Sequence, residues 1–222
     1  MNEQQDSSKS TREAIVFIDG NNFYHNINSL GISPSRVNFY KLAQFICKHF
    51  NANYKCAFYY NSVPSIDDGK EVYSKHMEFL NKVKNYPNFE VITRKLQRHS
   101  NEEKIIEKKR ILSTLNLCNK CAAIIEKNCM DCLGGIKKKE KGIDVKIAID
   151  MLNLSIFKRE CDLCILVSGD ADFIPVMDLI KENARDVVSA FLPFGYSWDI
   201  RKRHGWFILH RDLIIKKCLD RS

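Results

Sequence analysis

The sequence has no long apolar run. No stretch approaches the roughly 20 apolar residues that span a bilayer, and the first twelve residues, MNEQQDSSKSTR, lack the apolar segment of a secretory signal. These absences argue against a membrane-bound or secreted protein. We therefore expect a soluble, cytoplasmic protein with no membrane partner, in which residues 1–12 form a flexible tail.

The sequence also has neither an internal repeat nor a disulfide framework. Its nine cysteines are an odd number, and without a secretion signal they do not indicate paired bridges. A chain of 222 residues can bury one sizeable core, and 45% hydrophobic with 28% charged residues excludes a disordered chain. We expect one folded domain.

Positive charge is in excess. The formal net charge is +8, from 35 Lys and Arg against 27 Asp and Glu. The excess gathers in four clusters: Arg94, Lys95 and Arg98; Lys104, Lys108, Lys109 and Arg110; Lys137, Lys138 and Lys139; Arg201, Lys202 and Arg203. Such clusters favour a polyanion as partner, although a solvated basic face would leave the same pattern.

Short apolar runs alternate with segments of helical periodicity. The expected strands are Ala14–Ile18, Tyr54–Tyr60, Glu90–Thr93, Leu163–Val167 and Val187–Leu192. The expected helices cover about 34–50, 70–83, 143–157 and 173–183, followed by a basic helical region at the end. This alternation predicts an α/β fold with a central parallel sheet, formed by residues 13–217. A Lys- and Glu-rich insertion at about 97–140 interrupts it.

Three aspartates directly follow expected strands. Asp19 comes after Ala14–Ile18, while Asp170 and Asp172 come after Leu163–Val167. In open α/β sheets, ligands bind outside the carboxyl ends of the strands, so neighbouring strands would bring these carboxylates together. Each aspartate could instead serve only a turn or a helix cap. All of them being structural is the less plausible alternative.

A fourth aspartate, Asp144, opens the helix expected at 143–157. A helical wheel places Asp144 among apolar residues and therefore toward the core, where an ionised carboxylate requires a partner or a cation. The same wheel places Asp150 on the side of Lys146, with which it can pair at the surface. We therefore include Asp144 in the site and leave Asp150 out.

Clustered carboxylates suit Mg²⁺ or Mn²⁺, which take oxygen ligands and bridge to phosphate oxygens. Such ions assist phosphodiester hydrolysis. A phosphatase of the haloacid-dehalogenase type is a weak alternative, because it needs Asp-x-Asp after the first strand and Asp19 is followed by Gly20-Asn21.

Three segments, Phe17–Asn22, Lys141–Val145 and Leu166–Phe173, resemble the motifs of the NYN domain family, the LabA-like group of PIN-like nucleases. The resemblance implies a three-layer α/β/α PIN-like fold, divalent metal and, in active members, RNA cleavage. It assigns catalysis and metal binding to four aspartates: Asp19, Asp144, Asp170 and Asp172. It assigns supporting polar roles to Asn22 and Ser168. No histidine matches a catalytic position, and the insertion lies outside the minimal family pattern.

The favoured function is a Mg²⁺- or Mn²⁺-dependent endoribonuclease acting on single-stranded RNA. Basic residues would hold the backbone phosphates: Arg94, Lys95, Lys137, Lys138, Lys139, Arg201 and Lys202. Tyr24 and Trp198 could stack on unpaired bases, although most aromatic residues are core residues. The alternative is a catalytically inactive NYN module that binds RNA or recruits a partner. A homo-oligomer is compatible with either function.

The insertion contains two Cys-x-x-Cys pairs. Cys118, Cys121, Cys129 and Cys132 supply four thiolates in the pairwise spacing of zinc knuckles and ribbons, with a shorter spacer than usual. We expect structural Zn²⁺ at 118–132, with ordinary reduced thiols as the alternative. Cys161 and Cys164 have the same spacing, but they enter a strand and are expected to pack in the core.

Overall fold

The computed structural model describes residues 12–64, 66, 69–95, 97–98, 106, 110–133, 138–139 and 142–220. Of residues 97–98, 126, 128–133 and 138–139, only the backbone is described. The chain forms two compact units, of which unit 1 comprises Met1–Arg94 with Gly142–Ser222, and unit 2 comprises Lys95–Lys141. Each unit is described by itself.

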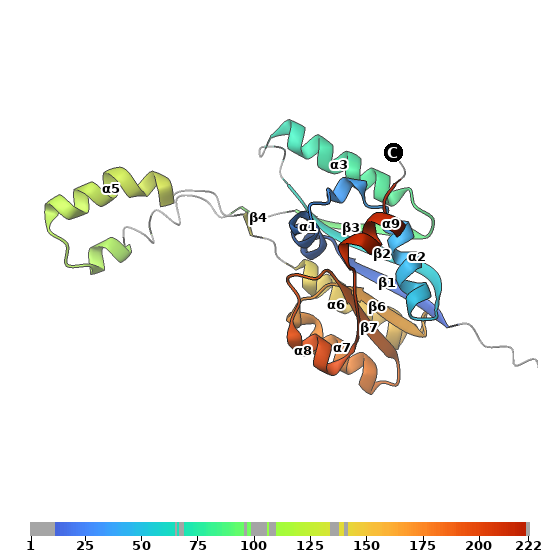
Figure 1. Cartoon of the computed structure of the whole chain (residues 1–222). Helices are drawn as coiled ribbons and strands as arrows, with labels where there is room; N and C mark the ends of the chain where they lie inside the picture. The colour runs from blue at the N-terminus through green and yellow to red at the C-terminus, as the bar shows by residue number, and fades with distance from the viewer. Residues whose placement is uncertain are drawn as a thin grey trace, which may run out of the picture. The chain divides into compact units, whose positions relative to one another are not determined.

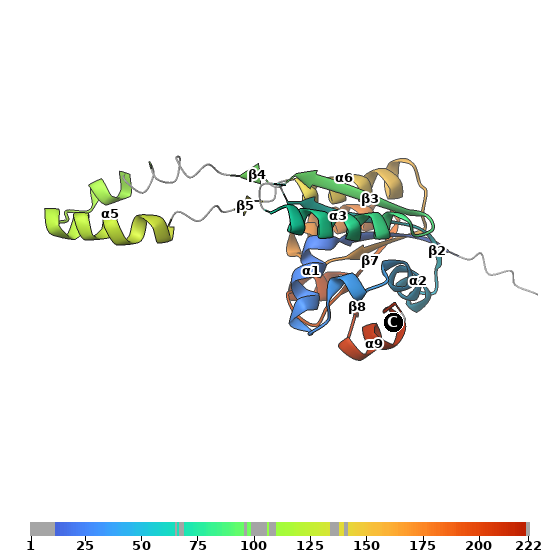
Figure 2. The same ribbon diagram turned by 90° about the horizontal axis from the view of Figure 1, so that it is seen from above.

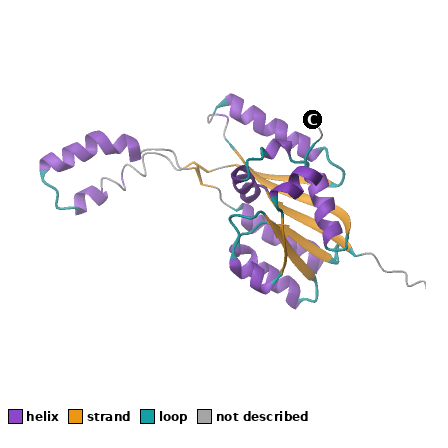
Figure 3. Ribbon diagram, viewed as in Figure 1, coloured by secondary structure: helices purple, strands orange, loops and turns teal. Residues whose placement is uncertain are grey.

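Unit 1 is built on a six-stranded sheet in which all strands are parallel and the order is β3-β2-β1-β6-β7-β8 (Figure 1; Figure 3). The strands are β1 (Glu13–Asp19), β2 (Asn53–Val63), β3 (Phe89–Lys95), β6 (Leu163–Val167), β7 (Asp186–Phe191) and β8 (Gly205–Ile208). This confirms the predicted α/β class and central parallel sheet.

The middle of the sheet is buried on both faces. Six of the seven residues of β1 and all five of β6 are buried, which explains why both segments appear in the sequence as continuous apolar runs. β1 pairs with β2 on one side and with β6 on the other. The strand that carries Asp19 therefore lies at the centre of the sheet.

Helices cover both faces of this sheet. One hydrophobic cluster packs β1 against α1, α2, α3 and α9, and a second packs it against α6 and α7. The helices are α1 (Gly20–Ser29), α2 (Phe39–His49), α3 (Lys70–Lys84), α6 (Ile143–Leu152), α7 (Ile174–Glu182), α8 (Trp198–Arg203) and α9 (Arg211–Lys217). Short helical turns are η1 (Pro34–Arg36), η3 (Asn153–Phe157) and η4 (Ala171–Phe173).

Two elements differ from the expectation. Helix α1 begins directly after β1, where the sequence predicted no helix. The basic region at the end is not purely helical, because β8 lies between α8 and α9 and pairs in parallel with β7. With four residues, β8 is too short to show a clear period.

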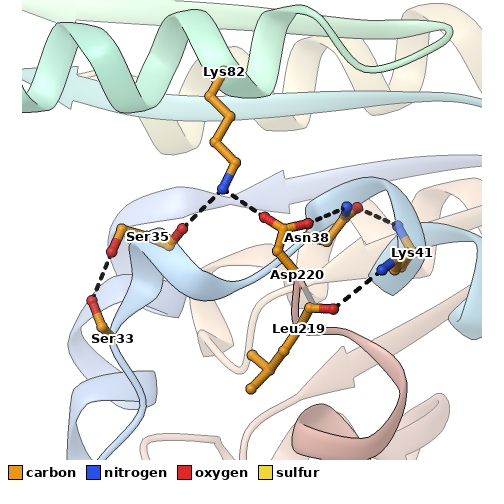
Figure 4. A network of polar contacts seen from close by, with 7 residues as sticks. All are labelled: Ser33, Ser35, Asn38, Lys41, Lys82, Leu219 and Asp220. Atoms are coloured by element: carbon orange, nitrogen blue, oxygen red, sulfur yellow. Dashed lines mark hydrogen bonds and ion pairs between the residues drawn. The ribbon is translucent and has the colours of Figure 1, made fainter. Parts of the chain in front are cut away.

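A polar network fixes the end of the described chain (Figure 4). Asp220 accepts a hydrogen bond from Asn38 at 2.7 Å and pairs with Lys82 at 2.6 Å. The Lys82 ammonium lowers the pKa of Asp220, and Lys41 donates to the Leu219 carbonyl at 3.2 Å. These bonds hold the segment after α9 against α2 and α3, and Figure 2 shows α9 beside α2.

Unit 2 contains a two-stranded ladder, a short helical stretch at 110–114 and the helix α5. β4 (Gln97–Arg98) and β5 (Lys138–Lys139) pair antiparallel, with Arg98 opposite Lys138. Helix α5 (Asn119–Leu133) is unbroken. None of the helices in the described part of the chain combines the length and apolarity that crossing a bilayer requires.

Candidate functional site

The carboxyl ends of β1 and β6 form the centre of the candidate site. The two strands are in parallel register, with Ile18 opposite Val167, so Asp19 and Ser168 leave the sheet side by side. On the other side of β1, Asp19 pairs with Tyr60 of β2. Neighbouring strands lie about 4.8 Å apart, so polar residues that follow these strands are within reach of one another.

Asp19 is buried and accepts hydrogen bonds at both of its carboxylate oxygens. Its Oδ1 accepts the Asn22 main-chain N–H at 3.0 Å, which caps α1, and its Oδ2 accepts the Ser168 hydroxyl at 3.1 Å. The next residue must be glycine, because a Cβ on Gly20 would lie 2.5 Å from the Tyr60 carbonyl oxygen. Asp19 thus serves as a helix cap, and Ser168 orients its carboxylate.

The loop after β6 is fixed by its own polar contacts. The buried Ser168 accepts the Asp170 main-chain N–H at 3.3 Å, and its carbonyl accepts the Ser189 hydroxyl at 2.7 Å. Asp170 caps η4 by accepting the Asp172 main-chain N–H at 3.0 Å. A Cβ on Gly169 would lie 2.6 Å from Tyr196, so this glycine permits the close approach of the loop that follows β7.

The negative charges of Asp170 and Asp172 act on Asp144. It lies in the first turn of α6, which packs against η4. Although its side chain is exposed, loss of hydration raises the pKa of Asp144, and the negative charges of Asp170 and Asp172 raise it further. Three carboxylates from two elements therefore repel one another, and a cation would relieve that repulsion.

The helical wheel for α6 was wrong in detail. Val145 and Ile149 are exposed, at 62% and 54%, whereas Ile143, Ile147 and Met151 face the sheet. The buried stripe therefore recurs every four residues and excludes Asp144. Because α6 is apolar on nearly every side, its pattern did not define which face packs.

Asp150 was expected at the surface and is instead buried. Its Oδ1 pairs with Lys146 Nζ at 2.6 Å, as predicted, and its Oδ2 accepts the Tyr60 hydroxyl at 2.8 Å. Burial raises the pKa of Tyr60, and the Asp150 carboxylate raises it further. A buried carboxylate needs such partners. Asp150 therefore joins α6 to β2.

The donors at this edge suit a hard cation. Carboxylate oxygens are what Mg²⁺ and Mn²⁺ prefer. Within the part of the chain that the structure describes, no three His, Cys, Asp or Glu side chains lie close enough to form a ready-made ligand set. Mg²⁺ does not require one, since it binds through one or two carboxylates and keeps several waters.

Several polar residues at this edge were missed. The Asn26 side chain donates to Asn22 Oδ1 at 3.1 Å, and the Asn21 side chain donates to Ser62 Oγ at 2.9 Å. Ser189 supports Ser168 from β7. A prediction of α1 could have found Asn26, because Asn22 and Asn26 stand four residues apart and share one helix face.

The predicted RNA contacts fall into three groups. Lys202 is exposed, as are Arg94 and Lys95 at the end of β3. Arg201 is engaged, since its guanidinium carbon lies 4.2 Å from the Trp206 ring centre and 4.6 Å from that of Trp198. Lys137 lies outside the described residues, as do the side chains of Lys138 and Lys139.

The structure does not form the predicted four-cysteine knuckle. Such a knuckle needs two tight turns, but the backbone from Asn119 to Leu133 is one helix. Cys121 and Cys129 stand eight residues apart, about 12 Å along a helix axis, whereas two thiolates on one zinc ion are at most about 4.6 Å apart. The helix therefore separates the two pairs. The side chains of Cys129 and Cys132 lie outside the described residues.

Comparisons with known proteins support the fold and identify the family. No curated protein matches the chain. The structure is similar to the crystal structure of VPA0982, a protein of unknown function from Vibrio parahaemolyticus RIMD 2210633, with a TM-score of 0.56 and 16% sequence identity. That similarity covers 96% of this chain and 99% of the Vibrio chain, and at this identity it concerns the fold alone. The NYN domain model matches residues 13–203. The chain therefore belongs to the NYN domain family, within the PIN-like nuclease superfamily.

Proposed function

We propose that this protein is a Mg²⁺- or Mn²⁺-dependent ribonuclease that cuts single-stranded RNA endonucleolytically at the edge formed by β1, β6 and α6. Asp19, Asp144, Asp170 and Asp172 are the proposed catalytic and metal-binding residues. Asn22 and Ser168 orient Asp19. The family supports a nuclease-related fold, and the metal, the substrate and the activity are the proposal.

The observation that carries the proposal is the electrostatic opposition at this edge. Loss of hydration raises the pKa of Asp144, and the charges of Asp170 and Asp172 raise it further, while Asp19 is held by Ser168, which also accepts the Asp170 N–H. Like charges held close together without a cation destabilise the folded state, so a purely structural role does not account for this cluster. A bound divalent cation would offset this repulsion.

The residues of the proposed site have different roles. When bound, the ion supplies activation of the attacking water and neutralises charge on the phosphodiester. Ser168 and the Asn22 main chain fix Asp19, so this carboxylate loses little further entropy on binding a cation. Asp170 is fixed by η4, and Asp172 and Asp144 remain open to the solvent from which RNA arrives.

Single-stranded RNA is the proposed substrate because aromatic side chains are exposed on elements beside the edge. Tyr24 lies in α1 and is 50% exposed, and Trp198 lies in α8 and is 64% exposed. The Ser197 N–H donates to the Gly169 carbonyl at 2.8 Å, which ties the start of α8 to the catalytic loop. Unpaired bases can stack on such rings, whereas paired bases cannot.

A cytoplasmic location is part of the proposal. The seven described cysteines are all free thiols, including Cys161 and Cys164, which are buried without bonding to each other. Free thiols on this scale are typical of a reducing compartment.

The test is cleavage of end-labelled single-stranded RNA with Mn²⁺ or with EDTA, by the wild type, Asp170→Asn and Asp162→Asn. Asp170 follows β6 and Asp162 precedes it, so the two variants remove one charge at opposite ends of one strand. We expect Mn²⁺-dependent internal cuts that Asp170→Asn abolishes and Asp162→Asn retains.

The alternative function gives a different result. A non-catalytic module would bind the same RNA in EDTA and in Mn²⁺ without cutting it. That outcome, or equal cleavage by both aspartate variants, would contradict the proposal.

A further inference from the structure

A pocket opens beside the candidate site, between α1, η1, the carboxyl end of β2 and α3. Its volume is about 390 Å³, which lies within the usual range of roughly 300–1,000 Å³ for small-molecule pockets. Its lining includes Tyr24, Pro34, Asn61, Val72, His76 and Phe79. None of these residues belongs to the acidic site.

The pocket lies next to the acidic edge. Asn61 directly follows Tyr60, whose Cα pairs with that of Asp19 across β1 and β2. Tyr24 is five residues beyond Asp19 in α1, about 7.5 Å along the helix. The pocket is therefore within reach of an RNA strand bound at the Asp19 carboxylate.

The walls suit a flat, aromatic group. Tyr24 and Phe79 contribute rings, and Val72 and Pro34 contribute aliphatic surface. Tyr24 is half exposed, so its ring face can be covered by a ligand without displacing a protein neighbour. Polar side chains stand between these apolar walls, as in pockets that orient a small ligand.

His76 supplies a hydrogen-bonding atom that the protein leaves unused. Its Nε2 is buried and has no hydrogen-bond partner. Burial lowers the pKa of His76, whose ring also bonds to the Ser62 main chain, so the imidazole is neutral at pH 7. The Ser62 main chain raises the pKa of His76, as a carbonyl that accepts an N–H from the ring does, so we assign the proton to Nδ1 and leave Nε2 as the acceptor. Nε2 is then an acceptor without a donor, which is costly in a buried position.

We propose that this pocket binds one unpaired nucleobase of the RNA strand that crosses the acidic edge, a proposal that rests on the function proposed above. The base stacks on Tyr24, and an N–H group on its Watson–Crick edge donates to His76 Nε2. Every RNA base carries such a donor, so the pocket selects unpaired over paired nucleotides. A base in a duplex has already used that edge and cannot enter.

The first test is a titration followed by NMR through the imidazole signals. The His76 signal is assigned by its loss in His76→Gln, and the protein receives each of the four nucleoside monophosphates, with ribose 5-phosphate as the control without a base. We expect the His76 signal to shift with the nucleotides and to stay in place with ribose 5-phosphate. Equal shifts with both ligands, or no shift with any nucleotide, would overturn the proposal.

The second test measures binding of a short single-stranded RNA in EDTA, where no metal supports cleavage. Tyr24→Ala should weaken binding about 5- to 150-fold, the loss expected for one stacked base, and Tyr24→Phe should retain it. Phe157→Ala is the matched control, because Phe157 is an exposed aromatic residue at the end of η3, toward the opposite edge of the sheet. Equal effects of Tyr24→Ala and Phe157→Ala would contradict the pocket.

The two proposals can fail separately. A protein that cuts RNA with Mn²⁺ but shows no base-dependent His76 shift has the activity without the pocket. A protein that shows the shift and the Tyr24 effect but never cuts RNA has the pocket without the activity.

Discussion

The two units of the chain differ in how their apolar side chains and thiols are placed. Unit 1 packs two clusters of buried apolar residues against the two faces of its sheet, with Cys47 and Cys164 among them. In unit 2, the described apolar residues Ile106, Ile111 and Ile124 are more than half exposed, and Cys118 is exposed as well. Unit 1 therefore supplies its own stability, while α5, at 15 residues, has the length at which isolated helices are marginal in water.

The two units also differ in the roles that we propose for their residues. Every proposed catalytic residue lies in unit 1, fixed by β1, β6, η4 or α6. Unit 2 offers exposed thiols and basic residues on a short ladder and a helix. We therefore expect losses of activity and stability to follow changes in unit 1, and reactivity toward small reagents to follow unit 2.

The largest expected effect is on cleavage. Asp170→Asn should reduce the Mn²⁺-dependent rate by roughly 10³-fold, the size found when one preorganised electrostatic contact is removed from an active site. Lys120→Ala in unit 2 should change the rate little. The rates are measured with the same labelled RNA at saturating Mn²⁺, and a greater loss from Lys120→Ala would place the chemistry in the insertion.

Alkylation of cysteines should show the next largest contrast. Burial raises the pKa of Cys47 to about 12, whereas hydrogen bonds to the Cys121 main chain and side chain lower the pKa of Cys118. Because the thiolate is the reactive form, Cys118 should react with iodoacetamide at least about 10³-fold faster near pH 8. Mass spectrometry of peptides from the native protein measures both rates.

Repeating the alkylation in the presence of EDTA tests whether the Cys118 thiolate is bound to a metal ion. If Cys118 reacts slowly and EDTA accelerates it, the thiolate is bound to a metal ion. That outcome would contradict the expected fast reaction of Cys118.

The buried contact between Asp150 and Tyr60 should contribute to stability alone. Asp150→Ala should lower the free energy of unfolding by about 1–3 kcal/mol, because it leaves the buried Tyr60 hydroxyl without its acceptor. Lys146→Met should cost less, since the Lys146 side chain is 35% exposed. Denaturant unfolding gives both values. A larger cost for Lys146→Met would show that the ion pair dominates the contact.

The smallest effect is expected from removing most of unit 2. Arg98 and Lys138 are paired across the β4–β5 ladder, so an Asn-Gly turn can replace residues 99–137 and close a hairpin. The free energy of unfolding of unit 1 should change by less than about 0.5 kcal/mol. A cooperative loss of structure, followed by circular dichroism, would show that the two units fold together.

The sequence predicted the parts of the fold that have a strong, unambiguous period. β1, β6 and β7 were found because buried parallel strands are apolar runs, and β2 and β3 because their segments are rich in aromatic or β-branched residues. α1 was missed because its polar first turn, Gly20-Asn21-Asn22, resembles a loop, and β8 because four residues show no period. Such elements form through tertiary packing and pairing, which local patterns do not record.

For the site, position along the chain was more informative than helical periodicity. Asp19 and Ser168 lie side by side because both directly follow neighbouring strands, and strand order is inferable from the fold class. The orientation of Asp144 and Asp150 was misjudged, since an apolar helix does not show which face will pack. His76 could not be identified from the sequence. Its Nε2 lacks a hydrogen-bond partner because of how α3 packs against the end of β2, which no local pattern records.

The central place of β1 also determines when the candidate site can be completed during synthesis. β2, which pairs with one edge of β1, is translated soon after it, but the other edge of β1 has no partner until β6 leaves the ribosome, and unit 2 must be translated in between. At roughly 5–20 residues per second, this delay is on the order of seconds. Asp170 and Asp172 emerge directly after β6, so the acidic edge is completed by the strand that closes the open side. A nascent chain that stops within the insertion therefore carries Asp19 without the other three proposed ligands.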